Sequence, residues 1–268
     1  MPSSQSVPAG RAFDSLAAEY DSIFTFSRIG RSQRDVVRNQ ALATFTSGSH
    51  ILELNCGTGE DALFLAQHGM RVTACDASPA MIANARTKTS NTDLARHINF
   101  YVLASEDLKM LPPQLHFDGV FSNFSGLNCV QDLRCVANEL AKRLRSEARL
   151  MLCFSTPYCA WETGYYLLHG NRHKAFRRSR GSCNAKIGTT TIPVYYPSPQ
   201  DIHRAFSPEF RLISVTGVGI TVPPSYMEGW VLKHPRLLQA FEAIDSTIRS
   251  WPLVRTLGDH MLLLLERA

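Results

Sequence analysis

A short apolar run followed by a glycine-rich turn is the feature of this sequence best suited to chemistry. The run is His50–Leu54, the turn is Asn55–Gly59, and Asp76 closes the next apolar run. A strand that turns sharply into a helix leaves backbone N–H groups facing outward, and glycines let a ligand approach them closely. An acidic residue after the second strand can accept hydrogen bonds from both hydroxyls of a ribose. The pattern therefore predicts a site for a nucleoside.

The same turn lacks the features that hold phosphates. A dinucleotide fingerprint has a third glycine, whereas Glu60, Asp61 and Ala62 follow Gly59 here. Two carboxylates suit the positive end of a helix dipole, but they would repel a pyrophosphate. The Gly-Lys-Ser/Thr of a P-loop is also absent, so a nicotinamide oxidoreductase is disfavoured. A nucleoside with a positive centre and no phosphate fits better, and S-adenosylmethionine is such a ligand.

Strands and helices alternate around this turn. Expected strands are His50–Leu54, Arg71–Cys75, Ile98–Val102, Phe117–Ser122, Arg149–Phe154, Arg211–Val215 and His260–Glu266. Expected helices cover parts of 11–46, where a second helical stretch begins near Ser32. Further helices are expected over 60–68, a stretch from Ser78, Gln131–Arg145, Ser198–Phe206 and 233–250. The alternation predicts an α/β fold with a mostly parallel sheet. Residues 155–197 break the rhythm, and we interpret them as an inserted cap.

Four segments together resemble the motifs of class I S-adenosylmethionine-dependent methyltransferases, over roughly residues 13–154. They are ELNCGTG, ACDASPAMIANAR, VLASEDLKMLP and FDGVFSNFSGLNCV. The resemblance implies a Rossmann-like sheet of seven strands in the order 3-2-1-4-5-7-6, with the last strand antiparallel. It also implies S-adenosylmethionine as cofactor and S-adenosylhomocysteine as product. The implied organisation is a tail and lid helix over 1–30, and a methyltransferase domain over 31–268 with a cap at about 155–200.

The resemblance also assigns cofactor-binding roles. Asp76 is the expected ribose ligand, and Ala77 and Met81 are expected against adenine. Tyr20, in the lid-like segment FDSLAAEYDSIF, would cover the cofactor, and Arg28 or Arg34 would pair with its carboxylate. The full expected set is Tyr20, Arg34, Glu53, Asn55, Gly57, Gly59, Asp76, Ala77, Met81, Ser105, Glu106, Asp107, Asn123 and Phe124.

Two positions depart from the family pattern. Asn55 replaces the first glycine of the turn, and because Asn tolerates left-handed backbone we expect the turn to survive. Ala104 stands where the third motif usually has an acidic residue, so the adenine amino group would be held by Glu106, Asp107 or the backbone. Purely structural roles compete with several assignments: Glu53 as a partner of a backbone N–H, Asp76 as a helix cap, Glu106 and Asp107 as helix starters, and Asn123 and Phe124 as loop and core residues.

Methyl transfer is an in-line displacement in which the enzyme mainly holds the nucleophile and the methyl group in line. A base is needed only if the acceptor loses a proton, and the candidates are His169, His173, Tyr195 and Tyr196. No Asn/Asp-Pro-Pro-Tyr/Phe motif follows the fourth strand, where Asn123-Phe-Ser-Gly126 stands instead. In related enzymes that motif holds a planar amino group, so we expect a small-molecule acceptor with a reacting oxygen or carbon. Aromatic cap residues would form its wall: Trp161, Tyr165, Tyr166, Tyr195, Tyr196 and Tyr226.

A basic run lies in the cap. It contains Arg172, Lys174, Arg177, Arg178 and Arg180, and Lys+Arg exceeds Asp+Glu by 28 − 23 = 5 over the whole chain. The run is either a solvated face or a docking patch for an acidic partner, such as a carrier protein, a phosphorylated substrate or RNA. RNA is disfavoured because few aromatic residues interleave the cations. A methyltransferase of a tethered or RNA substrate and a non-catalytic cofactor-binding protein stay open as alternatives.

Composition excludes several other classes. The chain has 268 residues, of which 44% are hydrophobic and 19% are charged, which is typical of a globular protein and not of a disordered one. No apolar run reaches the roughly 18 residues of a membrane span. The first ten residues lack the apolar core of a signal peptide, so we expect a cytoplasmic protein whose seven cysteines are reduced thiols. Neither Cys nor His residues show metal-ligand spacing, and no metal is expected.

Overall fold

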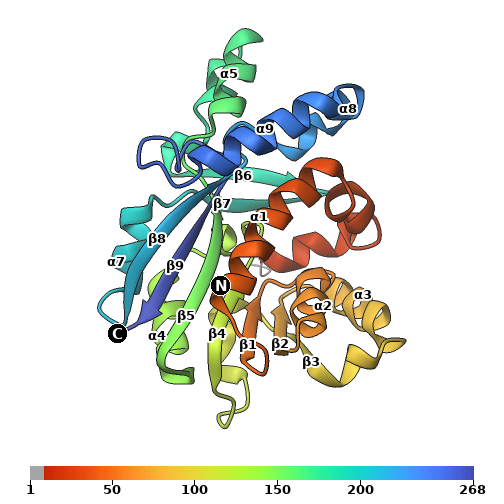
Figure 1. The fold of residues 1–268 in the computed structure, drawn as a ribbon, viewed down its shortest axis with the longest axis vertical. Helices are drawn as coiled ribbons and strands as arrows, with labels where there is room; N and C mark the ends of the chain where they lie inside the picture. The colour runs from red at the N-terminus through yellow and green to blue at the C-terminus, as the bar shows by residue number, and fades with distance from the viewer. Residues whose placement is uncertain (1–8) are drawn as a thin grey trace, which may run out of the picture.

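A computed structural model of the chain describes residues 9–268, which fold around a seven-stranded sheet of order β3-β2-β1-β4-β5-β9-β8 (Figure 1). Its strands are β1 (His50–Leu54), β2 (Arg71–Asp76), β3 (Ile98–Val102), β4 (Phe117–Ser122), β5 (Leu144–Ser155), β8 (Phe210–Val218) and β9 (His260–Arg267). The first five strands pair in parallel, and β9 runs antiparallel to both of its neighbours. Because β8 and β9 are the sixth and seventh strands of this sheet, the expected order 3-2-1-4-5-7-6 is confirmed.

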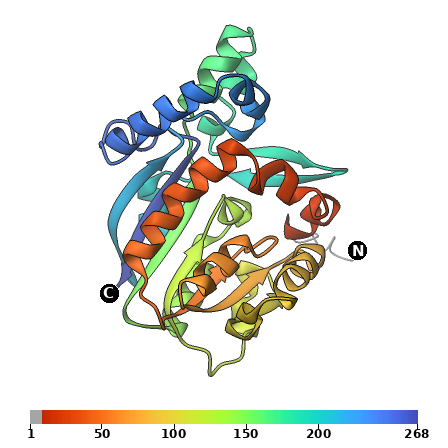
Figure 2. The ribbon, with the colours of Figure 1, turned by 45° about the vertical axis from the view of Figure 1, so that its right-hand side comes forward.

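Helices cover both faces of the sheet (Figure 2). The α-helices are α1 (Arg28–Thr44), α2 (Glu60–Gln67), α3 (Pro79–Ser90), α4 (Leu133–Arg143), α5 (Ala160–Leu168), α6 (Arg172–Ala175), α7 (Pro199–Phe206), α8 (Glu228–Lys233) and α9 (Pro235–Ile248). Shorter helical segments are η1 (Ala9–Leu16), η2 (Asp21–Thr25), η3 (Asp93–His97), η4 (Ser105–Met110), η5 (Gly126–Cys129), η6 (Arg178–Arg180) and η7 (Ser225–Met227). One buried cluster joins the sheet to α1, α2 and α3, and a second joins it to α4 and α7. Both faces of the sheet are thus buried from solvent, as a mostly parallel sheet requires.

Local signals place the helices that follow β2 and β4. Ser78 caps α3 by accepting a hydrogen bond from the backbone N–H of Met81, and Pro79 occupies the first helical position. The expected apolar stripe of α4 is buried, and its residues are Leu133, Val136, Ala137 and Leu140. The helix ends at Arg143, and Leu144 already opens β5, so this helix is shorter than the sequence predicts.

The segment expected to form a lid helix is two separate helical turns, η1 and η2. Contacts to α3 set its shape: the Asp14 carboxylate accepts hydrogen bonds from the Ser78 hydroxyl and from the Ala80 N–H at 3.2 Å, while the Ala17 carbonyl accepts one from Asn84 at 2.7 Å. These bonds tie the segment around η1 to α3. The first eight residues of the expected tail lie outside the described part of the chain.

Helix α1 begins at Arg28, four residues earlier than the sequence predicts. Ser27 caps its N-terminus by accepting from the Gly30 N–H at 2.9 Å. The Glu228 carboxylate accepts from the N–H groups of Arg28 at 2.7 Å and Ile29 at 3.0 Å. A residue distant in sequence thus satisfies two orphan donors, which explains why local signals missed the start.

Residues of the expected cap form α5, α6, η6 and a hairpin of β6 (Ser182–Ile187) and β7 (Thr190–Tyr195), separate from the main sheet. Helices α8 and α9 lie beside α5 (Figure 1). Trp161 of α5 packs against Phe241 of α9 with ring centroids 5.8 Å apart, and against Trp230 of α8 at 6.4 Å. The chain segments before and after β8 therefore build one layer above the carboxyl ends of the strands.

None of the helices within residues 9–268 has the length and apolar character needed to cross a membrane.

Candidate functional site

The turn after β1 adopts the left-handed conformation that its residue types predict. Asn55, Gly57 and Gly59 have φ angles of +55°, +54° and +74°, so the substitution of Asn for the first glycine leaves the turn intact. A side chain added at Gly57 would meet only the Tyr20 ring, at 3.9 Å, so the space in front of Gly57 is open to a ligand. A side chain added at Gly59 would collide with Ala85 at 2.9 Å and Phe100 at 3.1 Å. Gly59 therefore serves the packing of the turn, and its expected contact with the cofactor stays a prediction.

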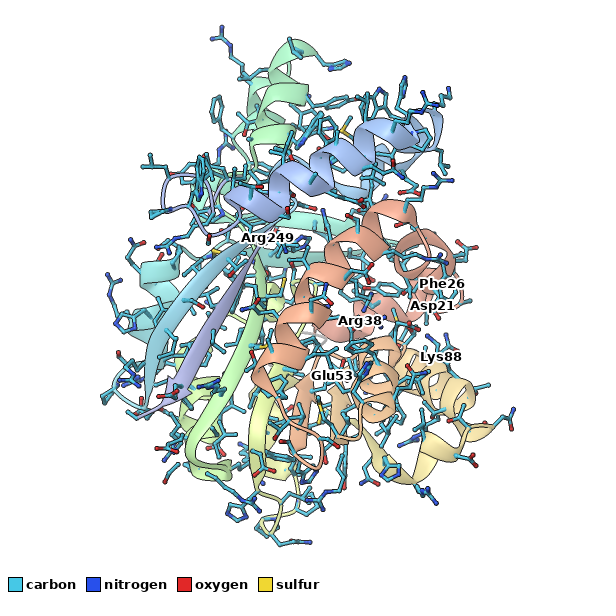
Figure 3. All side chains as sticks on the ribbon, viewed as in Figure 1. Asp21, Phe26, Arg38, Glu53, Lys88 and Arg249 are labelled. Carbon is cyan, nitrogen blue, oxygen red and sulfur yellow. The ribbon has the colours of Figure 1, made fainter. Side chains whose placement is uncertain are left out.

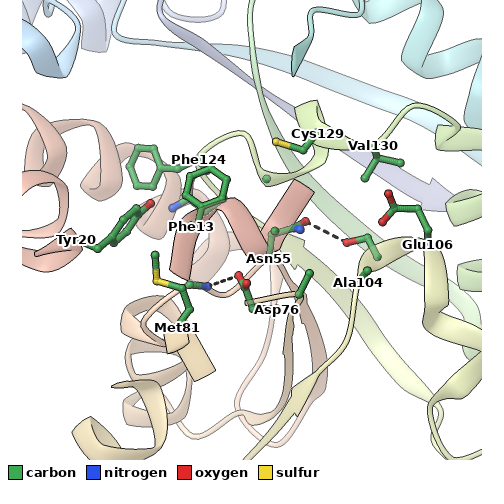
Figure 4. A pocket seen from close by; sticks show the side chains of 16 residues that line it. Phe13, Tyr20, Asn55, Asp76, Met81, Ala104, Glu106, Phe124, Cys129 and Val130 are labelled. Carbon is green, nitrogen blue, oxygen red and sulfur yellow. Dashed lines mark hydrogen bonds between the residues drawn. The ribbon is translucent and has the colours of Figure 1, made fainter. Parts of the chain in front are cut away.

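A cavity lies directly in front of this turn (Figure 4). Its walls are Gly10, Phe13, Tyr20, Asn55, Gly57, Asp76, Ala77, Met81, Ala104, Ser105, Glu106, Asn123, Phe124, Gly126, Cys129 and Val130. The structure thus brings together most of the residues predicted to bind cofactor. The enclosed volume is about 90 Å³. That is below the roughly 300–1,000 Å³ of typical ligand pockets, so a ligand of nucleoside size requires the walls to move apart.

Asp76 faces this cavity with a fixed carboxylate. One oxygen accepts a hydrogen bond from the Gly57 N–H at 2.9 Å, and the other accepts from the Ser78 N–H at 2.8 Å. Burial raises the pKa of Asp76, and these two N–H groups partly offset the effect. Each carboxylate oxygen retains a lone pair, so the pair of oxygens can accept hydrogen bonds from two neighbouring hydroxyls.

The opposite wall comes from the segment after β3. The Ser105 hydroxyl donates to the Asn55 side-chain oxygen at 3.1 Å, which joins this wall to the glycine-rich turn. Glu106 lines the cavity, and burial raises its pKa. Asp107 is exposed and does not line the cavity, so its expected contact with adenine stays a prediction. Glu106 is the carboxylate of this pair that can reach a ligand.

A buried charge cluster lies behind the turn and holds Arg34. The Arg34 guanidinium pairs with Asp61, which also accepts from Arg38 at 2.8 Å and from the Asn123 amide at 2.9 Å. Although burial alone would raise the pKa of Asp61, the charges of Arg34 and Arg38 outweigh it and lower that pKa. Arg34 does not line the cofactor cavity, and the Arg28 side chain is exposed. The expectation that one of these arginines meets a ligand carboxylate there is therefore not supported.

This cluster also revises the argument from charge repulsion. Glu60 pairs with Arg38 at 3.2 Å and with Lys88 at 3.3 Å, and Asp61 is compensated as described. The two acids at the start of α2 thus repel a phosphate less than the sequence predicts. The absence of a third glycine after Gly59 still argues against a dinucleotide site.

Glu53 lies in β1 beneath the same cluster (Figure 3). Its side chain is buried and does not line the cavity, so a direct contact with a cofactor is not what the geometry provides. One of its oxygens, Oε2, has no hydrogen-bond partner within residues 9–268. Burial, reinforced by the charge of Asp61, places the pKa of Glu53 well above its usual range.

The lid segment is anchored across the turn. Asp21 of η2 pairs with Lys88 of α3 at 2.7 Å and accepts from the Thr58 hydroxyl at 2.6 Å. Asp21 and Lys88 are both labelled in Figure 3. These contacts hold Tyr20 against the cavity, as the sequence predicts for a covering residue.

A second cavity of about 290 Å³ adjoins the first. Phe13, Tyr20 and Phe124 line both. The other walls of the second cavity are Leu16, Phe24, Gly30, Gln33, Arg34, Arg177, Arg178, Ile187, Pro224, Ser225, Tyr226, Asp259 and His260. Of the aromatic cap residues expected to face an acceptor, Tyr226 alone belongs to this set; Trp161, Tyr165, Tyr166, Tyr195 and Tyr196 do not.

The four candidate bases lie away from both cavities. His169 and His173 are exposed, and their rings contact the Tyr165 carbonyl at 2.8 Å and the Arg180 guanidinium at 2.9 Å. Tyr196 is buried with its hydroxyl 3.6 Å from the Cys183 sulfur, and the Tyr195 carbonyl accepts from Asn128 at 2.6 Å. His260 lines the second cavity and was not among the sequence candidates, because it lies at the start of the last strand, far from the motifs.

The basic run is not a uniform patch. Arg177 and Arg178 both bind the buried Glu162 carboxylate, at 2.6 Å and 2.8 Å, and Arg178 also binds Asp259 at 2.8 Å. Only Arg172, Lys174 and Arg180 are exposed, so a docking patch of five cations is wrong. Within the described residues no three His, Cys, Asp or Glu side chains gather as metal ligands, and the cysteines are free thiols.

Comparison with known proteins agrees with this geometry. The family model described as a methyltransferase domain matches residues 51–147, which contain the glycine-rich turn, Asp76 and the cavity walls from β3 and β4. Residues 51–147 therefore match a methyltransferase domain, and the strand order of the sheet is the one that the resemblance to class I S-adenosylmethionine-dependent methyltransferases implies. This family uses S-adenosylmethionine as its cofactor, and the open space at Gly57 and the aimed Asp76 carboxylate fit its adenosine part.

Two relatives show how far the sequence similarity of this chain extends. A demethylmenaquinone methyltransferase of Clavibacter sepedonicus is 31% identical over 54% of this chain and 57% of its own length. The chain thus spans little more than half of that relative. A malonyl-[acyl-carrier protein] O-methyltransferase of Serratia marcescens is 27% identical over 90% of this chain and 89% of its own length.

A solved structure supports the fold. The S-adenosylmethionine-dependent methyltransferase from Mesorhizobium loti superposes with a TM-score of 0.59 at 16% identity, covering 88% of this chain and 98% of its own.

Proposed function

We propose that this protein transfers a methyl group from S-adenosylmethionine to an oxygen or carbon of a small-molecule acceptor. The observation that carries the proposal is the cavity in front of Gly57, with the Asp76 carboxylate held by two backbone N–H groups at its edge. When bound, S-adenosylmethionine supplies an electrophilic methyl group on a sulfonium whose leaving group departs uncharged.

Different residues of the cavity hold different parts of the cofactor. Asp76 binds the ribose hydroxyls, and Ala77 and Met81 pack against adenine, with Glu106 within the same wall. Phe13, Tyr20 and Phe124 present aromatic rings to the remaining part of the ligand. Aromatic faces attract cations, so this end of the cavity suits the sulfonium. The main contribution of the chain is orientation and exclusion of water.

Calorimetric titration with S-adenosylhomocysteine tests the proposal. We expect binding to the intact protein, and Asp76→Ala should weaken it by about 1–3 kcal/mol, because charged hydrogen bonds to the ribose are lost. Asp107→Ala is the matched control, since Asp107 is an exposed acid outside the cavity, and it should bind as the unchanged protein does. Absence of binding at high micromolar ligand, or equal effects of the two substitutions, would contradict the proposal.

A carrier-protein-tethered acceptor is the second candidate, favoured by the similarity to the malonyl-[acyl-carrier protein] O-methyltransferase over nearly the whole chain. The exposed cations Arg172, Lys174 and Arg180 would meet the acidic carrier. Their joint replacement by glutamate should then abolish turnover and leave S-adenosylhomocysteine affinity unchanged, whereas a free small acceptor should still be methylated. Binding without turnover over a broad acceptor panel would identify a non-catalytic protein. The division of the chain at residue 30 and the cytoplasmic location stay predictions, and action on RNA stays a disfavoured alternative.

A further inference from the structure

The second cavity is the space next to the cofactor cavity that the proposed function leaves without a ligand. The two cavities share the rings of Phe13, Tyr20 and Phe124 as lining, so molecules in the two cavities would contact the same three side chains. Its walls continue with apolar side chains from the lid, the hairpin and the segment before α8, namely Leu16, Phe24, Ile187 and Pro224. This lining favours an apolar or aromatic molecule.

The charges around the second cavity are compensated. Arg34 pairs with Asp61, Arg177 pairs with Glu162, and Arg178 pairs with both Glu162 and Asp259. A cavity whose cations already have carboxylate partners offers little net attraction to an anion. An uncharged molecule therefore fits it better than a carboxylate or a phosphate.

His260 is a proton-accepting side chain on this wall. It is the first residue of β9, its side chain is 12% exposed, and its ring meets the Phe124 ring edge-on at a centroid distance of 5.6 Å. Its Nδ1 has no hydrogen-bond partner within residues 9–268 and lies 3.6 Å from an Asp259 carboxylate oxygen. The negative charge of Asp259 beside Nδ1 favours the tautomer that carries its proton on Nδ1, and that tautomer has a lone pair on Nε2.

We propose that the second cavity binds an uncharged, hydroxyl-bearing aromatic acceptor and that His260 accepts its hydroxyl proton during methyl transfer. The inference rests on the proposed function. As the acceptor oxygen forms its bond to the methyl carbon, the carbon–sulfur bond breaks with its electron pair on sulfur, and the hydroxyl proton moves to His260 Nε2. Asp259 stabilises the imidazolium, which later releases the proton to water.

The electrostatic setting agrees with a base. Burial lowers the pKa of His260, the Arg178 charge adds to this effect, and Asp259 opposes it. The Arg178 guanidinium, which pairs with Asp259 at 2.8 Å, keeps the Asp259 carboxylate ionised against the effect of burial. Arg34 and Tyr226 are further titratable groups on the same cavity wall. A neutral imidazole at pH 7 can take a proton, which an imidazolium cannot.

The first experiment follows the ring itself by ¹⁵N-histidine NMR on protein saturated with S-adenosylhomocysteine. His260→Gln assigns the His260 signals. We expect a neutral ring protonated on Nδ1, with signals that shift when 2-naphthol is added, while those of the exposed His169 stay unchanged. His260 signals that do not respond to millimolar 2-naphthol, or a ring protonated at pH 7, would overturn the inference.

The second experiment measures transfer of radiolabelled methyl from S-adenosylmethionine to a panel of one- and two-ring aromatic alcohols. His260→Gln should lower the rate about 100-fold or more with S-adenosylhomocysteine affinity within twofold of the unchanged protein. Added imidazole should restore part of the rate to His260→Ala, and His169→Gln should have no effect. If none of the alcohols is methylated, or if His260→Gln keeps full activity, the role of His260 is overturned while the proposed function stands. Failure of the unchanged protein to bind S-adenosylhomocysteine overturns both.

Discussion

At the scale of single residues, Glu53 has surroundings that disfavour its charged form. It is buried in β1, one of its oxygens lacks a partner, and its pKa lies well above the usual range because of burial and the neighbouring Asp61. A carboxyl group whose pKa is raised by folding favours the native state only while it is protonated. The stabilisation from protonated Glu53 is therefore complete below pH 4.5, the pKa of Glu53 in the unfolded chain. It is lost as the pH rises through the higher pKa of the folded protein.

Glu53→Gln should remove this loss of stability, because glutamine has no proton to release. Without ligand, the free energy of unfolding of the variant minus that of the unchanged protein is expected to be larger at pH 8 than at pH 5. Urea unfolding at the two pH values measures it. Glu147→Gln removes one exposed negative charge and is the control, for which the difference should be the same at both pH values. A pH-independent difference for Glu53→Gln would contradict the prediction.

At the scale of elements, the turn between β1 and α2 assigns different tasks to two glycines. Both Gly57 and Gly59 have positive φ, so an added side chain strains the backbone at either position by roughly 1–2 kcal/mol. At Gly59 it would also collide with Ala85 and Phe100, which belong to α3 and β3. At Gly57 it would project into the space in front of the turn.

Alanine substitution separates the two tasks. Gly59→Ala should lower the free energy of unfolding more than Gly57→Ala, because a collision adds to the strain. Gly57→Ala should weaken S-adenosylhomocysteine binding more than Gly59→Ala, because its methyl group occupies ligand space. Urea unfolding and calorimetry on both variants measure the two effects. If both quantities ranked the variants in the same order, the division of roles would be wrong.

The success of sequence prediction follows from the range of the contacts involved. The turn, the Ser78 cap and the stripe of α4 depend on residues within a few positions, so residue types and spacing revealed them. The start of α1 depends on Glu228, 200 positions from Arg28, and the fate of Arg34 depends on Asp61, 27 positions away. Such partners leave no local signal, which is why Arg34 was assigned to a ligand and α1 was begun too late.

At the scale of the whole molecule, one buried arginine joins the cap to the sheet. Arg178 binds Glu162 of α5 and Asp259 before β9, and it donates to the Asp259 carbonyl at 3.0 Å. From sequence these residues were a basic patch and two unremarked acids, because the pairing spans 81 positions. The position of the cap over the strands thus depends on a charge network that only the folded chain assembles.

Arg178→Gln should loosen this attachment. Breaking a buried ion network by removing one partner costs about 3–5 kcal/mol, since the remaining charges stay buried. We expect lower resistance to urea and faster proteolysis with cuts within 155–200. Arg180→Gln, an exposed neighbour, should behave as the unchanged protein does. Equal cleavage of the two variants would show that other contacts hold the cap.

The three rings common to both cavities have a consequence for how ligands act on each other. Phe13, Tyr20 and Phe124 line both cavities, so a ligand that displaces these rings in the first cavity also changes the wall of the second. The two ligands are therefore thermodynamically linked: each ligand changes the affinity of the protein for the other by the same factor. Recognition of the acceptor is in this sense a property of the loaded protein rather than of the empty one.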